Sequence, residues 1–459
     1  MIRRIGIGVV ALWMLWTAAL LPLAVSANYE LPEDKKKTLT ADAALVMYLG
    51  TDMSRDMIMF EQNADKRMTP GGMVRVMVGM YALKVIEEYN IDTAVATGTY
   101  TEEVFDLIAG QDIATVGMQY GDVWHVDDLL TIGVIRTAAD AVGTLSVTLA
   151  GSHERFVEGM NALAAEIGCA DTHFTNVFGL DHAEQYTTAR DMYKILRYAT
   201  LHYPQMIDIL SLKEHTTAPV LGEAETWITA NEMLRESSEY FYSPLVYGRT
   251  GNSETGGHAS ASVARDSGFE FMTVVMGCKD DDETTEGLAF RDTKTLFRWV
   301  YNSFSYRTMV RKGQPITRVG VDLAWSVDST ALVAGDDLEG MLRSDVDLGT
   351  LRYEVVLSEE IQNRGGRVEA PLEKGQVCGE ARVYDGEDPV GTVSLVVGES
   401  VERSQVLAVL SAVWGVITNP FVLTVLGVMA ALFIGYVVMT VSHNKKRRRQ
   451  KRRPVKRYK

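Results

Sequence analysis

Apolar residues recur along the first part of the chain in two different rhythms. Two short apolar runs, residues 43–50 and 57–61, predict the strands of a β-hairpin that turns at residues 52–56. From residue 72 to 88 the apolar positions instead recur every three to four residues. This spacing predicts a buried or half-buried helix whose methionines pack in the core. The positions are Met73, Met77, Met80 and Leu83.

Helical spacing returns in the middle of the chain. It covers residues 126–150, 155–167 and 188–199, and Thr187 or Thr188 is placed to cap the last of these segments.

The pattern then becomes strand-like. Residues 258–265 alternate in polarity, residues 269–277 follow as a second apolar run, and residues 266–268 read as the turn between them. Residues 296–304 predict a helix that closes the domain. The order of these elements predicts an α/β domain in which helices pack on an antiparallel sheet.

The composition shifts between about residue 314 and residue 398. Short strand-like runs alternate there with turn residues, and no long helical period appears. This pattern predicts a small all-β domain.

The C-terminal segment is typical of a membrane anchor. Residues 420–441 contain no charged side chain, and a helix of that length spans a bilayer core of about 30 Å. The apolar residues 406–418 precede it and are expected to lie in the membrane interface or to lengthen the span. A tail with 11 Lys and Arg follows, which favours a cytoplasmic location and contact with anionic lipid.

The N-terminal segment indicates secretion. Arg3 and Arg4 precede a long apolar run that ends in small residues at Ser26 and Ala27, the pattern of a signal peptide. An uncleaved membrane anchor is the alternative. Either reading places the part of the chain between this segment and the C-terminal span outside the cell membrane.

The charge balance of that outer part argues against one class of partner. The two terminal segments hold 13 of the 45 Lys and Arg, which leaves 32 against all 60 Asp and Glu, a net charge of −28. Such a surface repels phosphates, so we expect no nucleic-acid partner. The three cysteines form no disulfide framework, and the eight histidines show no metal-ligand spacing, so we expect neither metal nor cofactor.

Together these patterns divide the chain into five expected parts. They are a signal peptide (1–27), an α/β domain (28–305), a C-terminal β domain (313–400), a membrane-interface segment with a transmembrane helix (405–443) and a basic cytoplasmic tail (444–459).

Several segments, taken in order, resemble the serine D-alanyl-D-alanine carboxypeptidases among the low-molecular-weight penicillin-binding proteins (peptidase S11). The resemblance runs from about residue 38 to residue 400 and is specific as a set, although each piece alone is weak. It implies a penicillin-binding-protein-like domain followed by a small β domain. The segments are residues 61–65 with Pro70, 126–130, Asn161, Gly168, 172–176, 179–181, 186–191, 231–234, 249–251 and 370–376.

The resemblance also shows where the chain departs from the family. The family works through Ser-x-x-Lys, Ser-x-Asn and Lys-Thr-Gly motifs. At the first, this chain has Gly72 in place of the nucleophile and Arg75 in place of the base, and arginine does not release its proton near neutral pH. At the second it has Thr137 and Ala139, so a hydroxyl remains and the amide is lost.

The third motif persists with its charge preserved, as Arg249, Thr250 and Gly251. In the family this motif holds the terminal carboxylate of the substrate, so the resemblance implies a ligand-binding role for these residues. An arginine fork matches a carboxylate through two hydrogen bonds. The competing interpretation is that Arg249 merely pairs with a nearby acid such as Glu254.

Two functions remain open from the sequence. In the first, the protein is a catalytically inactive homologue that binds peptidoglycan stem peptides or cell-wall proteins at the membrane. In the second, it is an active carboxypeptidase or another hydrolase whose catalytic residues are not recognised. The only lysine preceded by Ser or Thr at the required spacing lies at the edge of the span, at residues 442–445, which favours the first hypothesis. A third hypothesis is that the protein serves only as a structural spacer.

Overall fold

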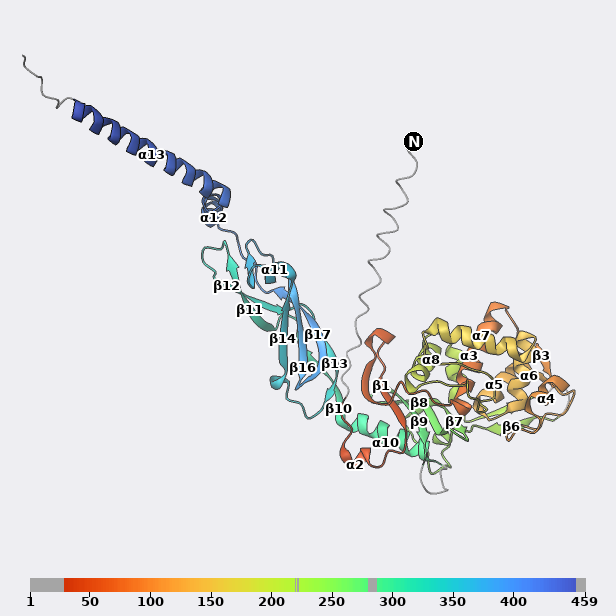
Figure 1. Cartoon of the computed structure of the whole chain (residues 1–459). Helices are drawn as coiled ribbons and strands as arrows, with labels where there is room; N and C mark the ends of the chain where they lie inside the picture. Colours follow the sequence, from red (N-terminus) through yellow and green to blue (C-terminus); the bar gives the residue numbers. More distant parts are fainter. Residues whose placement is uncertain (1–28, 219, 221–222, 280–286, 451–459) are drawn as a thin grey trace, which may run out of the picture. The chain divides into compact units, whose positions relative to one another are not determined.

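A computed structural model describes residues 29–218, 220, 223–279 and 287–450, without the side chains of residues 446–450 (Figure 1). The predicted signal peptide lies outside the described residues. The chain divides into two compact units. The first comprises residues up to Arg307 with Glu339–Arg352 and Tyr384–Gly391, and the second comprises Thr308–Leu338, Tyr353–Val383 and Thr392–Lys459.

A five-stranded antiparallel sheet organises the first unit, with strand order β2-β1-β9-β8-β7. The predicted hairpin is confirmed: β1 pairs with β2, and Asp52 caps the short 3₁₀ turn between them. The predicted pair β8 and β9 is confirmed as well. The strands are β1 Ala43–Tyr48, β2 Met57–Gln62, β7 Leu245–Ser253, β8 Gly257–Asp266 and β9 Phe269–Cys278.

Both faces of this sheet are buried, because its strands carry apolar residues in both directions. In β1, Leu45 and Met47 point into a core shared with the helices α3 and α5 to α9, whereas Ala44 and Val46 point into a second core beneath α10. Figure 1 shows the larger group of helices gathered beside the sheet. These helices are α3 Val74–Glu88, α5 Val126–Ile135, α6 Ala139–Ala150, α7 His153–Ile167, α8 Ala189–His202, α9 Pro204–Ser211 and α10 Leu288–Ser303.

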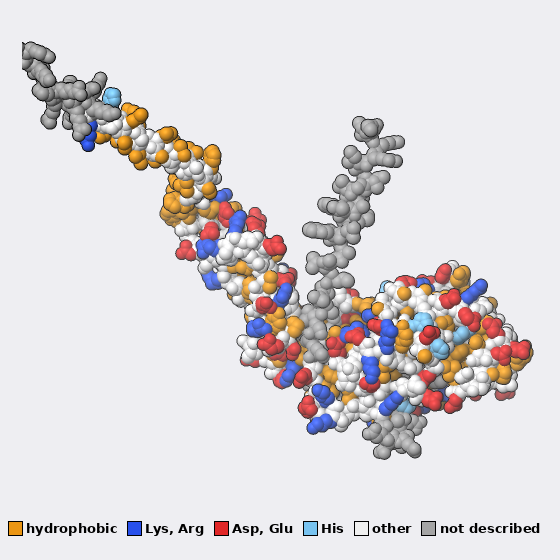
Figure 2. Space-filling view, in the orientation of Figure 1, with side chains coloured by type: hydrophobic (Ala, Val, Ile, Leu, Met, Phe, Trp, Pro, Cys, Tyr) orange, Lys and Arg blue, Asp and Glu red, His pale blue; other side chains and the backbone are white. Residues whose placement is uncertain are grey.

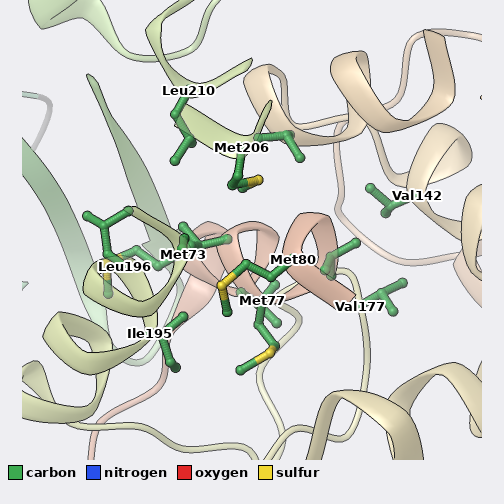
Figure 3. Close-up of a cluster of buried hydrophobic side chains, with 14 of the residues drawn as sticks. Met73, Met77, Met80, Val142, Val177, Ile195, Leu196, Met206 and Leu210 are labelled. Atoms are coloured by element: carbon green, nitrogen blue, oxygen red, sulfur yellow. The ribbon is translucent and has the colours of Figure 1, made fainter. Parts of the chain in front are cut away.

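Helix α3 lies at the centre of the larger core. Met73, Met77 and Met80 are each at most 1 % exposed, as their helical spacing predicts. Figure 3 shows them among side chains of α8 and α9. The methionines therefore serve packing.

One helix prediction is wrong in its extent. Residues 126–150 form two helices, α5 and α6, because the backbone at Arg136 is extended and ends α5. Hydrophobic spacing continues across the interruption, so periodicity alone does not reveal it.

The closing helix α10 also begins earlier than expected, at Leu288, and ends at Ser303. Its first half contains polar residues, one of which is buried. Asp292 is 2 % exposed and accepts hydrogen bonds from the main chain and side chain of Thr40 and from the main chain of Ala41. The capping prediction for α8 is confirmed, because Thr188 accepts a hydrogen bond from the Asp191 N–H.

Further short elements belong wholly or mostly to this unit. They are α2 Glu33–Lys36, β3 Thr97–Thr99, α4 Glu102–Ile108, β4 Val123–His125, β5 Glu214–Thr217, β6 Glu225–Ile228, β10 Phe304–Val310 and β13 Leu338–Arg343. The strands among them pair as three two-stranded sheets, β3 with β4, β5 with β6 and β10 with β13.

The second unit confirms the predicted all-β domain. Its six-stranded sheet has the order β14-β16-β17-β12-β11-β15, and β15 joins β11 in parallel. Alternating burial along β12 and β17 produces one buried face, as a period of two requires. The elements are β11 Pro315–Asp322, β12 Ser329–Ala334, β14 Arg352–Leu357, α11 Glu359–Asn363, β15 Arg367–Glu369, β16 Val377–Asp385 and β17 Asp388–Val397.

Two apolar helices follow, α12 Gln405–Ile417 and α13 Pro420–Gln450. Within the described residues, Pro420–Lys445 of α13 is the one helix long and apolar enough to cross a membrane, and none of its apolar window is buried. Figure 2 shows hydrophobic side chains along α12 and α13. Such exposure is unfavourable in water, so these residues are suited to an apolar environment.

Candidate functional site

A cleft of about 580 Å³ lies in the first unit where the three motif positions meet. Gly72 comes from the 3₁₀ turn before α3, Thr137 from the break between α5 and α6, and Thr250 and Gly251 from β7. The structure therefore brings together positions that are far apart in the sequence. Four acidic or imidazole side chains also line the cleft, those of Asp112, Asp181, Glu254 and His258.

Main-chain segments pack directly against one another at the cleft floor. A Cβ atom on Gly251 would lie 2.7 Å from the Met73 nitrogen, and one on Gly179 would lie 2.3 Å from the Gly71 oxygen. Both distances are too short for any side chain. Gly72 is less restricted, because its Cβ would lie 3.2 Å from the Thr250 oxygen and 3.5 Å from Nη2 of Arg249.

Arg75 lies behind this floor and is completely buried. Its Nη1 donates to the Ala138 oxygen at 3.4 Å and its Nη2 donates to the Phe178 oxygen at 3.2 Å, while its Nε has no partner in the structure. Burial, followed by the positive charge of Arg249, lowers the pKa of Arg75 to about 9, against the opposing charge of Asp140. The guanidinium therefore stays protonated at neutral pH.

Arg249 is buried beside it, at 2 % exposure, and does not line the cleft. Its three nitrogens donate to the carbonyl oxygens of Gly72, Ile135 and Arg136, at 3.3, 3.3 and 3.2 Å. Burial, followed by the charge of Arg136, lowers its pKa to about 10. The structure thus pairs Arg249 with carbonyls and not with Glu254. Ligand binding through Arg249 stays a prediction, which requires the guanidinium to leave these oxygens.

The break between α5 and α6 explains how two arginines are held without a carboxylate. The last carbonyl groups of a helix have no partner within the helix, and a cation near them interacts favourably with the helix dipole. Ile135 and Arg136 end α5, and Ala138 precedes α6, and their oxygens accept from the arginines. The Ile135 oxygen also accepts the Ala230 N–H, and the Ala138 oxygen also accepts the Val142 N–H. The interruption that hydrophobic spacing conceals therefore builds this part of the site.

The two residues predicted for the second motif, Thr137 and Ala139, differ in exposure. Thr137 is exposed and lines the cleft, whereas Ala139, the predicted counterpart of the family's amide residue, is fully buried. The next residue, Asp140, was not anticipated. Its carboxylate accepts the N–H groups of Val116 and Met118 and so holds the loop that lines the cleft at Ala114.

Asn176 is a second residue whose role the sequence did not reveal. It belongs to a segment that resembles the family, and its side-chain oxygen accepts the N–H groups of Phe178, Gly179 and Leu180. This turn carries Gly179 against the cleft floor. Within the described residues, no group of three His, Cys, Asp or Glu is arranged to hold a metal ion.

Two family profiles match the chain. The D-alanyl-D-alanine carboxypeptidase family (Peptidase_S11) matches residues 31–280, and the C-terminal domain of penicillin-binding protein 5 matches residues 304–403. These ranges cover the five-stranded sheet, the three motif positions of the cleft and the β domain. More than half of the chain thus matches the first family.

Individual proteins agree with this assignment. The chain is 25 % identical over 370 residues to the D-alanyl-D-alanine carboxypeptidase DacD of Escherichia coli, which covers 78 % of this chain and 87 % of that protein. Its fold is similar to penicillin-binding protein 5 from Haemophilus influenzae, with a TM-score of 0.57, 21 % identity and coverage of 82 % of this chain and 100 % of the other. The carboxypeptidase DacD from Francisella tularensis gives a TM-score of 0.62 at 18 % identity, over 82 % of this chain and 95 % of the other. The protein belongs to the D-alanyl-D-alanine carboxypeptidase family.

Proposed function

We propose that this protein is a catalytically inactive homologue of the D-alanyl-D-alanine carboxypeptidases that binds peptidoglycan stem peptides or cell-wall proteins without cutting them. The observation that carries the proposal is the pair of residues at the nucleophile and base positions. Gly72 lines the cleft but offers no hydroxyl, and the guanidinium of Arg75 is bonded to the oxygens of Ala138 and Phe178.

Acyl transfer of this kind requires a hydroxyl nucleophile and a base that accepts its proton. Arg75, with a pKa of about 9, remains protonated at neutral pH and has no lone pair to accept a proton. Loss of a nucleophile typically reduces such a rate by a factor on the order of 10⁶. The residual rate is too slow for a biological role.

The alternative is an active hydrolase that uses another residue of the cleft, and Ser253 is the natural candidate. It lines the cleft and is 6 % exposed. Its hydroxyl donates to Oδ1 of Asp181 at 2.6 Å and accepts the Gly256 N–H at 2.7 Å. Because Asp181 also accepts two hydrogen bonds from Thr255, this arrangement is typical of a side chain that stabilises a turn.

A ligand-binding role is compatible with the shape of the cleft. Its volume of about 580 Å³ suits a short peptide, and Thr250 presents a hydroxyl while Gly251 exposes main chain. Arg249 places a positive charge beneath the floor at Gly72, which favours a ligand that ends in a free carboxylate. We expect weak binding, with a Kd of roughly 1 mM, equivalent to about 4 kcal/mol.

Covalent labelling tests the loss of catalysis. The full-length protein is incubated with a fluorescent penicillin, and its intact mass is measured, with heat-denatured protein as the control. We expect no adduct and no release of D-alanine from a pentapeptide. An adduct that disappears on prior denaturation would overturn the proposal, and peptide mapping would then show whether it lies on Ser253.

Titration with peptides tests the binding role. A peptide that ends in D-Ala-D-Ala is compared with its C-terminal amide, and only the free acid is expected to bind. The variant Thr250→Val is expected to weaken this binding because it removes a hydroxyl and preserves the shape of the side chain. Equal binding of acid and amide would contradict carboxylate recognition.

The location of the protein is part of the proposal. Helix α13 would span the membrane, with residues 28 to about 405 outside the cell membrane and the basic tail in the cytoplasm, where it could contact anionic lipid. Protease added to wall-stripped cells is expected to digest the outer units and to leave a membrane-protected fragment that carries the tail. Cleavage of the tail with survival of the units would contradict this orientation.

A further inference from the structure

A tryptophan projects from the β domain next to the apolar C-terminal helices. Residues 323–328 connect β11 to β12, and Trp325 in this loop is 71 % exposed. Among the tryptophans in the described part of the chain, only Trp325 and Trp414 of α12 are exposed. A single exposed apolar side chain is common on protein surfaces, so the surroundings of Trp325 decide whether it has a role.

The loop is attached to the point where the apolar C-terminal segment begins. The Leu323 oxygen accepts a hydrogen bond from the Ser404 N–H at 2.7 Å. Ser404 caps α12, since its hydroxyl accepts from the Leu407 N–H. Leu323 itself has a φ of 63°, which is unfavourable for a residue with a Cβ atom and persists only when neighbouring contacts hold it. The loop is therefore fixed beside the start of α12.

Helix α12 continues this contact along its length. A groove of about 600 Å³ is lined by Leu323 of the loop and by three apolar residues of α12, which are Leu407, Leu410 and Trp414. Leu410 and Trp414 are exposed. The loop and the apolar helix therefore adjoin on one side of the β domain.

The charge pattern places the start of α12 at a membrane surface if α13 spans the bilayer. Residues 404–442 contain no Asp, Glu, Lys or Arg. As one straight helix, residues 405–441 would measure about 55 Å, well above a bilayer core of about 30 Å. Exposure of α12 to water is unfavourable, so α12 lies in the interface or enters the bilayer. In either arrangement Ser404 and the attached loop lie near the lipid headgroups.

The carboxylates that line the groove do not oppose contact with headgroups, because arginines neutralise them. Asp322 pairs with Arg367 at 2.7 Å, and Glu369 pairs with Arg364 at 2.9 Å. Residues 323–327 of the loop carry no charge. The desolvation of an unpaired charge therefore does not have to be overcome at this surface.

We propose that the loop of residues 323–328 is a membrane contact of the β domain, with the Trp325 ring between the lipid headgroups and the acyl chains. Tryptophan favours this depth because its ring is apolar and its indole N–H is polar. Together with α12, the loop holds the β domain against the bilayer and fixes its orientation to the membrane. This inference rests on the proposed spanning role of α13 and adds a contact made by the folded domain.

Spin labels on the full-length protein test the contact. The protein is reconstituted in vesicles of phosphatidylethanolamine and phosphatidylglycerol, and a nitroxide is attached at Ser326→Cys, an exposed position that keeps Trp325. The three native cysteines are buried and are not expected to react. We expect this label to collide with oxygen more than with a water-soluble nickel chelate, at a depth of roughly 5 to 10 Å from the bilayer surface.

Two further label sites calibrate the measurement. Lys312→Cys lies at an exposed position before the opposite end of β11, so its label should collide mainly with the nickel chelate. Leu432→Cys lies within α13, so its label should collide mainly with oxygen and lie deeper than the label at Ser326→Cys.

Removal of the ring tests the role of Trp325. Trp325→Ser, combined with Ser326→Cys, is expected to move the label toward water because the apolar ring no longer holds the loop in the interface. The control is Tyr120→Ser, which removes a similarly exposed aromatic ring from the first unit and should leave the depth of the label unchanged.

The outcomes separate this inference from the proposed location. A label at Ser326→Cys that meets the nickel chelate, while the label at Leu432→Cys meets oxygen, overturns the loop contact and leaves the span standing. Labels in water at both positions overturn both. A loop label that meets neither reagent also overturns the contact, because protein then covers the loop. A depth that Trp325→Ser does not change overturns the role of the ring.

Discussion

Two regions of the first unit bury arginine side chains in opposite ways. Arg197 of α8, at 3 % exposure, donates to both oxygens of Asp56 at 2.8 and 2.9 Å, and Tyr193 donates to the same carboxylate at 2.7 Å. Arg75 and Arg249, behind the cleft, have only carbonyl partners at 3.2 to 3.4 Å.

The difference shows which region contributes to stability. A buried cation is tolerated when a carboxylate neutralises it and its donors are satisfied. The region around Asp56 meets both conditions, whereas Arg75 meets neither, since its Nε has no partner and Arg249 repels it. Unfavourable electrostatics of this kind are typical of functional sites. The cleft therefore has an electrostatically unfavourable floor.

The largest expected effect tests the stabilising region. Arg197→Met leaves Asp56 as an unpaired buried charge, so the free energy of unfolding is expected to fall by about 3 to 5 kcal/mol. Urea denaturation measures the loss. The control is Arg190→Met, because Arg190 pairs with Glu61 and Asp65 at a partly exposed site. That variant should lose only about 1 kcal/mol, and an equal loss would contradict the comparison.

The opposite sign is expected at the cleft. Arg75→Met removes a buried cation that has no carboxylate partner and replaces it with an apolar side chain of similar length. The two carbonyls lose long hydrogen bonds, so we expect a net gain of about 1 to 2 kcal/mol in the free energy of unfolding. The same urea denaturation measures it. A loss of more than about 1 kcal/mol would show that Arg75 supports the fold.

A smaller change in stability is expected when a hydroxyl is restored to the floor. The new Cβ in Gly72→Ser would lie close to the Thr250 oxygen, which destabilises the folded state. Loss of the glycine also restricts the unfolded chain, which offsets this effect, so the free energy of unfolding should change by no more than about 1 kcal/mol. The variant should form no penicillin adduct, because Arg75 supplies no base.

The double variant Gly72→Ser/Arg75→Lys separates these two requirements. It places a lysine one helical turn from the serine and is expected to be acylated slowly, by intact mass. Rapid acylation of the single variant would show that the base is not the limiting loss.

The smallest effect concerns pH. His153 is buried against Phe178 at a ring distance of 5.1 Å, and burial lowers its pKa below the usual 6.5. As the pH falls below about 6.5, the unfolded state therefore takes up a proton at this histidine before the folded state does. The free energy of unfolding decreases as the pH falls, and no such loss occurs above about pH 6.5. His153→Phe should reduce the loss between about pH 6.5 and pH 5 in thermal unfolding. The exposed control His202→Gln should retain it, and an unchanged slope in His153→Phe would contradict the assignment.

Much of the architecture followed from the sequence, because burial imposes a period on it. The hairpin of β1 and β2, the methionine-rich helix α3, the strands β8 and β9 and the all-β unit all carry the apolar spacing that their burial requires. The assignment of the three motif positions, made from residues taken in order, stays a prediction, although the structure brings these positions to one cleft.

Tertiary structure alone decided how those residues are used. The interruption at Arg136 leaves the hydrophobic spacing unchanged, yet it places the carbonyls of Ile135 and Ala138 where they accept from Arg249 and Arg75. The sequence placed Arg249 on a strand next to a possible ligand, whereas packing turned its guanidinium toward the protein interior. The cleft brings Asp112 together with Asp181 and Glu254, which are distant in the sequence. Such contacts depend on which distant segments meet, and a local pattern contains no information about that.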